Sequence, residues 1–266
     1  MGAHKSPIYW WQWPNLLAID TAVIVATWAA VFAHQAKQSL PIAHILILAL
    51  STWIAYQADR LLDVRSKSIK ALLSRRHQFA QQHQRTLWCW LTAMLAINLG
   101  LASSQLSFSE LKKGVWLLAA VMTYTLLNQI VHKKYGLKEL SIALIISASV
   151  VWSMPAFDDW YLLGLFAWQC LLNCLLITQK EAAIDRASAV ASIAPVLTPI
   201  RIWPLALLPL SFLWLWDHAI AHGLWLSYLL LTILYWQQKR LHPELYRVLA
   251  DTALLAGALY ALWAIH

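Results

Sequence analysis

Long apolar segments separated by short polar stretches dominate this chain and limit what it can fold into. Hydrophobic residues make up 61% of the sequence and charged residues 12%, which is not the composition of a soluble globular domain. About 20 apolar residues suffice for a helix to cross a bilayer, and no strand-like alternation is present. Nine segments approach that length, at residues 15–35, 41–59, 87–106, 114–131, 140–157, 160–179, 203–217, 223–237 and 246–265. We therefore predict an all-α integral membrane protein, a bundle of nine transmembrane helices.

No long linker divides these segments, so we expect one transmembrane domain over residues 1–266. Residues 1–14 precede the first predicted helix, and residues 64–86 form a loop after the second. Within that loop, residues 68–85 have an amphipathic pattern. We expect them to form a short helix that acts as a lid over the mouth of a site.

The basic residues indicate the orientation in the membrane. With nine spans, all but three of the 20 Lys and Arg residues fall on the side that holds the N-terminus; the exceptions are Lys37, Lys112 and Lys113. The positive-inside rule makes that side cytoplasmic and places the C-terminus outside. The compact chain favours a bacterial inner membrane. Most of the positive charge needs no explanation beyond topology and attraction to anionic lipid, and nucleic acid is excluded as a partner because no soluble domain could bind it.

Two acidic pairs stand at the cytoplasmic ends of predicted spans. Asp59 and Asp63 end the second span, and Glu181 and Asp185 follow the sixth. Each pair has i, i+4 spacing, so both carboxylates share one helix face. A helix C-terminus already carries partial negative charge, so these carboxylates require a compensating cation. The four residues are a third of the 12 acidic residues in the chain.

The second and sixth spans run in the same direction, which brings both pairs to the same depth. A single pair is more often a solvated face or a partner for a nearby arginine. Two pairs at one level instead favour a metal site, and hard divalent cations such as Mg²⁺ prefer carboxylate and phosphate oxygens. We therefore predict that Asp59, Asp63, Glu181 and Asp185 hold Mg²⁺ against a diphosphate.

The chain resembles the UbiA-type superfamily of intramembrane prenyltransferases. That family has nine helices and two aspartate-rich motifs at the cytoplasmic ends of the second and sixth helices. Asp59 and Asp63 match the later aspartates of the first motif, although Ala55 replaces its Asn. Glu181 and Asp185 match the second motif, and Ser192-Ile193-Ala194 resembles its tail. The segment Ser74-Arg75-Arg76-His77, the pair Lys133-Lys134 and the segment Trp152-Ser153-Met154-Pro155 are also similar to family sequences.

The resemblance implies a Mg²⁺-dependent prenyltransferase that ionises an allylic prenyl diphosphate and transfers the prenyl group to a lipophilic, aromatic acceptor. The four acidic residues would be catalytic through the metal. The basic residues near them are candidates to bind the diphosphate; they are Arg75, Arg76, Lys133, Lys134 and Arg186. Tyr56 and Tyr124 could face the carbocation through their rings, although packing is the simpler role for each.

Two further acids lie near the cytoplasmic ends of spans, Asp20 in the first and Asp251 in the ninth. Ionisable residues inside a membrane are functional candidates by default. We expect Asp251 to pair with Arg247, one turn earlier. Asp20 could bind a basic residue of the site, take a proton from the acceptor or reach the membrane surface.

Three other functions remain open. They are a catalytically silent membrane scaffold of the same fold, a Mg²⁺-dependent terpene cyclase and a transporter. A transporter would be expected to carry polar residues near the middle of the membrane and interrupted helices, whereas these acids lie at span ends. The sequence identifies neither the acceptor, the prenyl chain length nor the oligomeric state.

Overall fold

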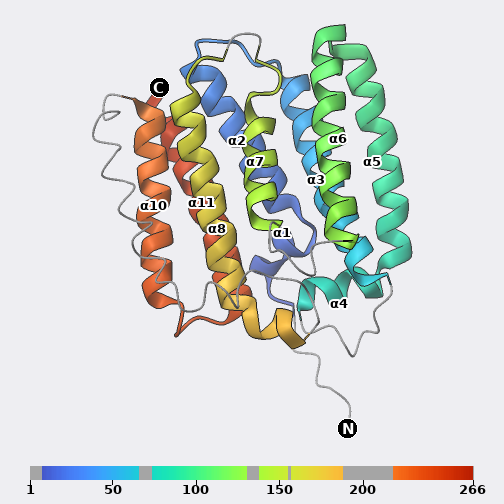
Figure 1. The fold of residues 1–266 in the computed structure, drawn as a ribbon, viewed down its shortest axis with the longest axis vertical. Coiled ribbons are helices and arrows are strands. Elements are labelled where there is room, and N and C mark those ends of the chain that lie inside the picture. Colours follow the sequence, from blue (N-terminus) through green and yellow to red (C-terminus); the bar gives the residue numbers. More distant parts are fainter. Residues whose placement is uncertain (1–7, 66–73, 131–137, 155–156, 188–217, 266) are drawn as a thin grey trace.

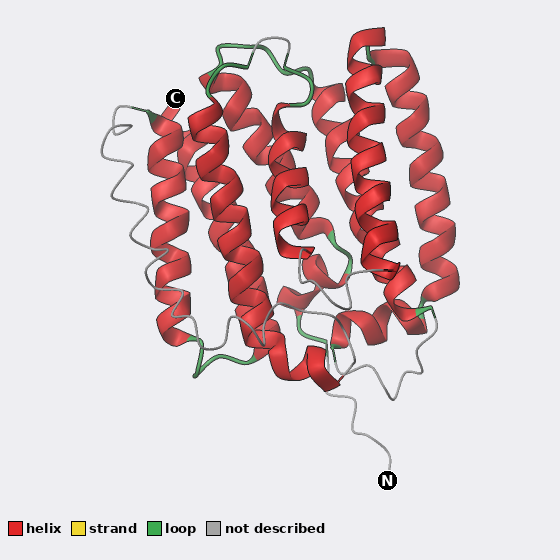
Figure 2. Ribbon diagram, in the orientation of Figure 1, coloured by secondary structure: helices red, strands yellow, loops and turns green. Residues whose placement is uncertain are grey.

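The computed structural model describes residues 8–65, 74–130, 138–154, 157–187 and 218–265, with the backbone alone at 128–130 and 185–187. The described residues form helices and no strands (Figure 2). The elements are a 3-10 turn η1 (Trp10–Gln12) and the helices α1 (Trp13–Leu16), α2 (Ile19–Gln35), α3 (Ile42–Val64), α4 (Arg75–Gln82), α5 (Gln84–Gln105), α6 (Phe108–Ile130), α7 (Lys138–Val151), α8 (Trp160–Ala187), α10 (Ala219–Gln237) and α11 (Pro243–Ile265). The predicted all-α class is confirmed for this part of the chain.

Five of these helices, α3, α5, α8, α10 and α11, are long and apolar enough to cross a membrane, and α1 with α2 makes a sixth if the bent pair counts as one span. A multi-pass membrane protein is therefore supported, but nine spans are only partly so. Helix α6 is long enough but has charged residues in its first two turns, and α7 has 14 residues, fewer than a span requires. The predicted span at 203–217 lies outside the described residues.

The helices pack side by side in one bundle (Figure 1). Helix α2 contacts α3, α7 and α11, while α8 contacts α7, α10 and α11. Helices α5 and α6 lie at the right of Figure 1, where α5 packs on α3 and α6 on α7. The short helix α4 lies across the lower end of the bundle, near α1 and the last turns of α3 and α8. This end corresponds to the predicted cytoplasmic side.

An aromatic core joins the helices that carry the candidate residues. Trp28 and Phe32 of α2 and Phe166 of α8 are fully buried. The ring centroids of Trp28 and Phe166 are 4.9 Å apart, and those of Phe32 and Phe166 are 5.5 Å apart. The indole Nε1 of Trp28 donates to the Leu254 carbonyl of α11 at 3.1 Å. This contact fixes α2, α8 and α11 relative to one another.

The first predicted span is broken rather than continuous. Helices α1 and α2 meet at 74°, and Ala18 between them has a left-handed backbone with φ 56°. The break ends the hydrogen-bonding pattern of α1, although the Ala18 backbone N–H still donates to the Asn15 carbonyl at 3.2 Å. Arg60 of α3 donates to the carbonyls of Asn15 (3.0 Å) and Leu16 (2.6 Å). Trp53 Nε1 donates to the Leu17 carbonyl at 2.7 Å. These two side chains thus donate to the backbone carbonyls at the break and hold the start of α2 inside the bundle.

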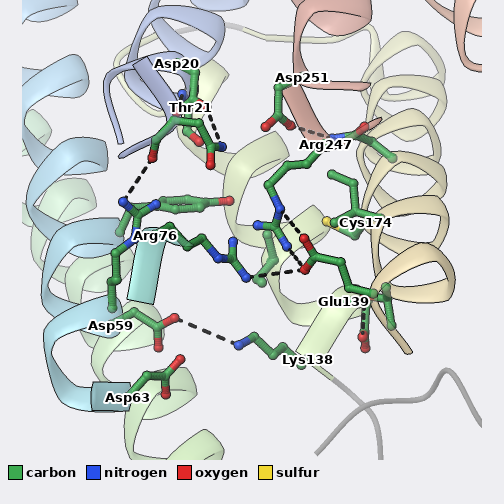
Figure 3. Close-up of a pocket in the computed structure, with 18 of the residues that line it drawn as sticks. Asp20, Thr21, Asp59, Asp63, Arg76, Lys138, Glu139, Cys174, Arg247 and Asp251 are labelled. Carbon is green, nitrogen blue, oxygen red and sulfur yellow. Dashed lines mark hydrogen bonds and ion pairs between the residues drawn. The ribbon is translucent and has the colours of Figure 1, made fainter. Parts of the chain in front are cut away.

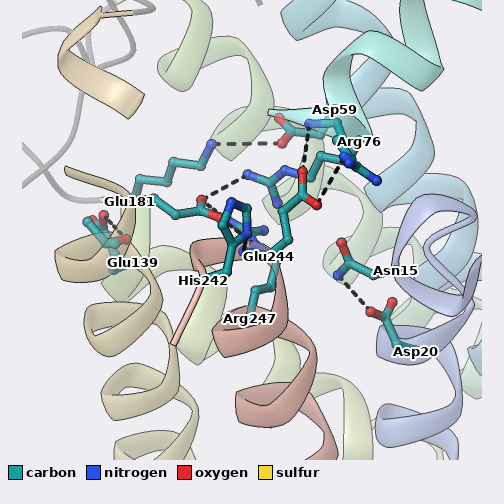
Figure 4. Close-up of polar contacts among 12 residues, drawn as sticks. Asn15, Asp20, Asp59, Arg76, Glu139, Glu181, His242, Glu244 and Arg247 are labelled. Carbon is teal, nitrogen blue, oxygen red and sulfur yellow. Dashed lines mark hydrogen bonds and ion pairs between the residues drawn. The ribbon is translucent and has the colours of Figure 1, made fainter. Parts of the chain in front are cut away.

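Helix α4 is held from both sides. Its buried Ala80 packs against Leu61 and Val64 of α3. The Arg75 Nε lies 3.4 Å from Glu244 Oε2 of α11, and Arg75 Nη1 donates to Gln12 Oε1 at 3.2 Å. The amide of Gln12 in turn donates to Glu244 Oε2 at 2.7 Å (Figure 4). The expected amphipathic helix within 68–85 is therefore present from residue 75; its earlier part lies outside the described residues.

Candidate functional site

A polar cavity of about 150 Å³ lies beside α4, at the lower end of the bundle in Figure 1, and Figure 3 shows its lining in close-up. Seven helices line it, with α1 and α2 on one side, α3 and α4 next to them, and α7, α8 and α11 opposite. Its ionisable and amide side chains are Asn15, Asp20, Tyr56, Asp59, Arg60, Asp63, Arg76, His77, Lys138, Glu139, Asn173, Cys174, Glu181, Arg247 and Asp251. Burying so many charged groups in an apolar bundle costs folding free energy, so this cluster marks a candidate site.

The structure brings most of the predicted site residues to this one cavity. Asp59 and Asp63 from α3 reach it across from Glu181 of α8. Arg76, Tyr56, Asp20 and Asp251 also line it. Their convergence follows from the parallel course of α3 and α8, which end on the same side of the bundle (Figure 1).

Asp59 faces a lysine that sequence reasoning did not assign to the site. The ammonium of Lys138, the first residue of α7, lies 4.0 Å from Asp59 Oδ2, and both side chains are about one quarter exposed. The other oxygen, Asp59 Oδ1, is buried and accepts no hydrogen bond from any described residue. Asp63 lies one turn further along α3 and points to the same side (Figure 3). Two carboxylates thus meet one ammonium here.

Glu181 has the opposite balance of charge. It is 5% exposed, and both of its oxygens accept hydrogen bonds from Arg247 of α11. The Arg247 Nε lies 2.9 Å from Oε1, and its Nη2 bonds Oε2. The Arg76 Nη2 of α4 lies 3.6 Å from the same Oε2. One carboxylate is therefore enclosed by two guanidinium groups (Figure 4).

The inner end of the cavity carries two acids held by neutral donors. The Asn173 amide of α8 donates to Asp251 Oδ1 at 3.1 Å. Asp20 Oδ2 accepts from the Asn15 amide at 2.8 Å, and its Oδ1 accepts from the Thr21 backbone at 2.9 Å. The expected pairing of Arg247 with Asp251 is wrong, because the guanidinium turns instead to Glu181 on the neighbouring helix.

A smaller, apolar pocket of about 60 Å³ adjoins the polar cavity. Helices α3, α6 and α7 form it, with the lining residues Ala55, Tyr56, Asp59, Val121, Tyr124, Thr125, Ile142, Ile145 and Ile146. Tyr56, Asp59 and Ile142 line both spaces. A charged chamber thus borders an apolar one, and Asp59 lies where the two meet. Tyr124, predicted as a cavity residue, lines only the apolar pocket.

Some predicted residues lie elsewhere or outside the described part of the chain. Arg75 contacts Glu244 and Gln12 and does not line the cavity, so its expected role in binding a diphosphate is not supported. Asp185 and Arg186 belong to the last turn of α8, where only the backbone is described. Lys133, Lys134, Pro155 and the segment 192–194 are outside the described residues.

Sequence reasoning missed several residues that shape the cavity, among them Lys138, Glu139, Asn173 and Arg247. Lys138 is the last basic residue before the fifth predicted span, and Arg247 lies one turn before Asp251, so both positions carried a signal. Glu139 is buried and accepts from Thr178 of α8 at 3.1 Å. Nothing in the sequence marks it or Asn173 as part of a site.

The side chains that the structure describes fit a divalent cation at one side of the cavity. Among the described residues, no three His, Cys, Asp or Glu side chains are grouped to hold a metal. The pair Asp59 and Asp63, with the orphaned Asp59 Oδ1, suits one hard cation whose remaining ligands are water and phosphate oxygens. Glu181 does not suit one, because two guanidiniums already bind it.

No model of a known protein family matches the chain, and neither curated proteins nor solved structures include a match.

Proposed function

We propose that this chain is a multi-pass membrane prenyltransferase, similar to the UbiA-type enzymes, that ionises an allylic prenyl diphosphate and transfers the prenyl group to a lipophilic aromatic acceptor. The observation that carries the proposal is the junction of the charged cavity and the apolar pocket at Tyr56 and Asp59. An amphiphile with a polyanionic head and a hydrocarbon tail matches both spaces at once.

The cations of the cavity would bind the diphosphate head. Arg76 and Lys138 lie on elements at the mouth of the cavity, α4 and the start of α7. A guanidinium presents a planar set of donors that matches phosphate oxygens, whereas an ammonium acts as a point charge. Lys133, Lys134 and Arg186 remain proposed contributors. Together these groups would orient the head and stabilise it as it leaves.

Mg²⁺ would be held by Asp59 and Asp63. When bound, it supplies positive charge that stabilises the departing diphosphate. Asp59 and Asp63 would position that charge beside the apolar pocket, which Asp59 also lines. Glu181 would act by orienting Arg247 and Arg76, and Asp185, one turn further along α8, remains a proposed fourth acidic residue of the site.

The apolar pocket would hold the tail and shield the allylic cation from water. Isoleucines of α7 and Val121 of α6 form its walls, and Tyr56 and Tyr124 offer aromatic rings. Such walls exclude the water that would otherwise capture the cation. When an acceptor carbon forms the new bond it loses a proton, and Asp20 and Asp251 are the carboxylates nearest the inner end of the cavity. The proposed location is a bacterial inner membrane with the cavity mouth cytoplasmic.

The test is release of diphosphate by the purified protein. Allylic diphosphates of several chain lengths would be supplied with Mg²⁺ or EDTA, in the presence or absence of a lipid-and-quinone extract. We expect Mg²⁺-dependent release that Asp59→Asn abolishes. The matched control is Asp158→Asn, an exposed acid before α8 at the opposite end of the bundle, which should retain full activity.

Mass spectrometry of the products separates the proposal from its alternatives. A prenylated acceptor supports it, whereas a hydrocarbon without acceptor mass identifies a terpene cyclase. Uptake of the intact diphosphate ester into vesicles would identify a transporter. A folded protein that releases nothing in any mixture would be a silent scaffold, and the proposed activity would be wrong.

A further inference from the structure

We propose that Arg247, together with Arg76, forms an anion site on Glu181 that binds the diphosphate without a metal, so that the protein holds one divalent cation and not two. This inference rests on the proposed function for the identity of the anion. It concerns the half of the cavity formed by α4, α8 and α11.

The charges around Glu181 favour an anion. Arg247 occupies both carboxylate oxygens in a side-by-side arrangement, and Arg76 Nη2 lies 3.6 Å from one of them. Within this cluster of described side chains, two guanidiniums therefore outweigh one carboxylate. A divalent cation entering here would be repelled and would find no unoccupied oxygen on Glu181. A phosphate group would instead be attracted.

Donors remain on the two guanidiniums for such a ligand. Each guanidinium has five N–H groups, and Glu181 takes two from Arg247. The Nε of Arg76 is buried and has no hydrogen-bond partner among the described residues. A buried, unmatched donor on a cationic side chain that lines a cavity is itself a sign of a missing acceptor.

The opposite wall has the complementary character. Among the described residues, Asp59 and Asp63 face the ammonium of Lys138, and no donor reaches Asp59 Oδ1. A cation belongs on this wall and an anion on the other. A diphosphate spanning the cavity would then be bound by the metal at one end and by Arg247 and Arg76 at the other.

Glu181 acquires a defined role in this arrangement. It is buried, it comes from α8, and it links Arg247 of α11 with Arg76 of α4. The carboxylate holds both guanidiniums on one side of the cavity, where they would otherwise repel each other. It is thus a positioning residue and not a metal ligand, although the sequence pattern predicted it as a ligand together with Asp59 and Asp63 of α3.

Two binding measurements on the purified full-length protein test the inference. The first counts Mn²⁺ ions by electron paramagnetic resonance. We expect one per chain, lost in Asp59→Asn and retained in the double variant Glu181→Gln/Arg247→Gln, which removes both partner charges together. A second Mn²⁺ in the wild type, or loss of the ion in the double variant, would overturn the inference.

The second measurement is calorimetric titration of inorganic diphosphate in EDTA. We expect metal-free binding that weakens at least tenfold in Arg247→Gln and in Arg76→Gln. The control is Arg240→Gln, which removes the same charge from the exposed loop between α10 and α11 and should bind normally. Equal binding by Arg247→Gln and the wild type, or no binding by the wild type, would contradict the anion site.

These results are independent of turnover. If Mn²⁺ and inorganic diphosphate bind as expected but no allylic diphosphate is ionised, the proposed function fails and the anion site stands. If ionisation occurs with two Mn²⁺ ions bound, the enzyme assignment stands and this inference fails.

Discussion

The ammonium of Lys138 on α7 lies 4.0 Å from Asp59 Oδ2 on α3, and this pair lines the polar cavity where it borders the apolar pocket. At that separation, two unit charges interact by about 4 kcal/mol at an effective dielectric constant of about 20, and solvent in the cavity reduces this value. The lysine therefore competes with any divalent cation for Asp59.

Replacing that lysine should tighten metal binding. In Lys138→Met, Asp59 and Asp63 keep their charge but lose the ammonium, so we expect Mn²⁺ to bind about tenfold more tightly, equivalent to about 1.4 kcal/mol. The metal-free variant should melt at a lower temperature than the wild type and recover when Mg²⁺ is added. Lys239→Met, at an exposed position, is the control. Unchanged Mn²⁺ affinity in Lys138→Met would show that the cation does not bind at Asp59.

The neighbouring arginines of α4 should have separable effects. Arg75 anchors the helix to Glu244 and Gln12, whereas Arg76 enters the cavity. We expect Arg75→Gln to cost about 1 kcal/mol, as for a partly exposed ion pair, and to speed amide exchange across residues 75–82. Arg76→Gln should leave that exchange unchanged and weaken diphosphate binding. Exchange mass spectrometry with a binding titration measures both, and identical behaviour of the two variants would refute the division of roles.

The acidic site was predictable because topology alone fixes the depth of a helix end. Once the second and sixth predicted spans run in the same direction, Asp59, Asp63 and Glu181 must reach one level of the bundle. Apolar length likewise predicted that nearly every span within the described residues is a helix. Neither inference requires knowing which helices are neighbours.

The partners of these residues were not predictable, because they depend on packing between helices distant in sequence. Arg247 and Asp251 share a helix face at i, i+4, which favours a local pair, yet α8 presents Glu181 closer to the guanidinium. Consecutive residues on a helix point about 100° apart, which is why Arg75 and Arg76 separate. The break at Ala18 carries no glycine, and Arg60 and Trp53, which satisfy it, come from another helix.

The packing of α10 against α11 should depend on Gly223 and Gly257, because neither position leaves room for a Cβ. A Cβ on Gly257 would overlap the side chain of Ser227 and the carbonyl of Gly223, whereas a Cβ on Gly100 of α5 would meet nothing within 4 Å. Gly257→Ala is expected to cost about 2 kcal/mol through overpacking. Gly100→Ala makes the same chemical change where space is open, and should leave stability unchanged or raise it by up to about 1 kcal/mol. Thermal unfolding in detergent compares them; equal melting temperatures would mean that the close helix contact is absent.

The apolar pocket should limit the length of the hydrocarbon tail. Val121 of α6 lines it, while Leu118 on the same helix is 57% exposed and faces outward. Val121→Trp fills a space of about 60 Å³, so long allylic diphosphates should lose at least tenfold in kcat/KM, roughly 1.4 kcal/mol of transition-state stabilisation, while the shortest are little affected. Leu118→Trp adds the same indole on the outer face and should keep the wild-type preference. The comparison is made by competition between chain lengths in one reaction. If Val121→Trp processes all lengths as the wild type does, the tail lies elsewhere, and the junction at Asp59 no longer supports an amphiphilic substrate.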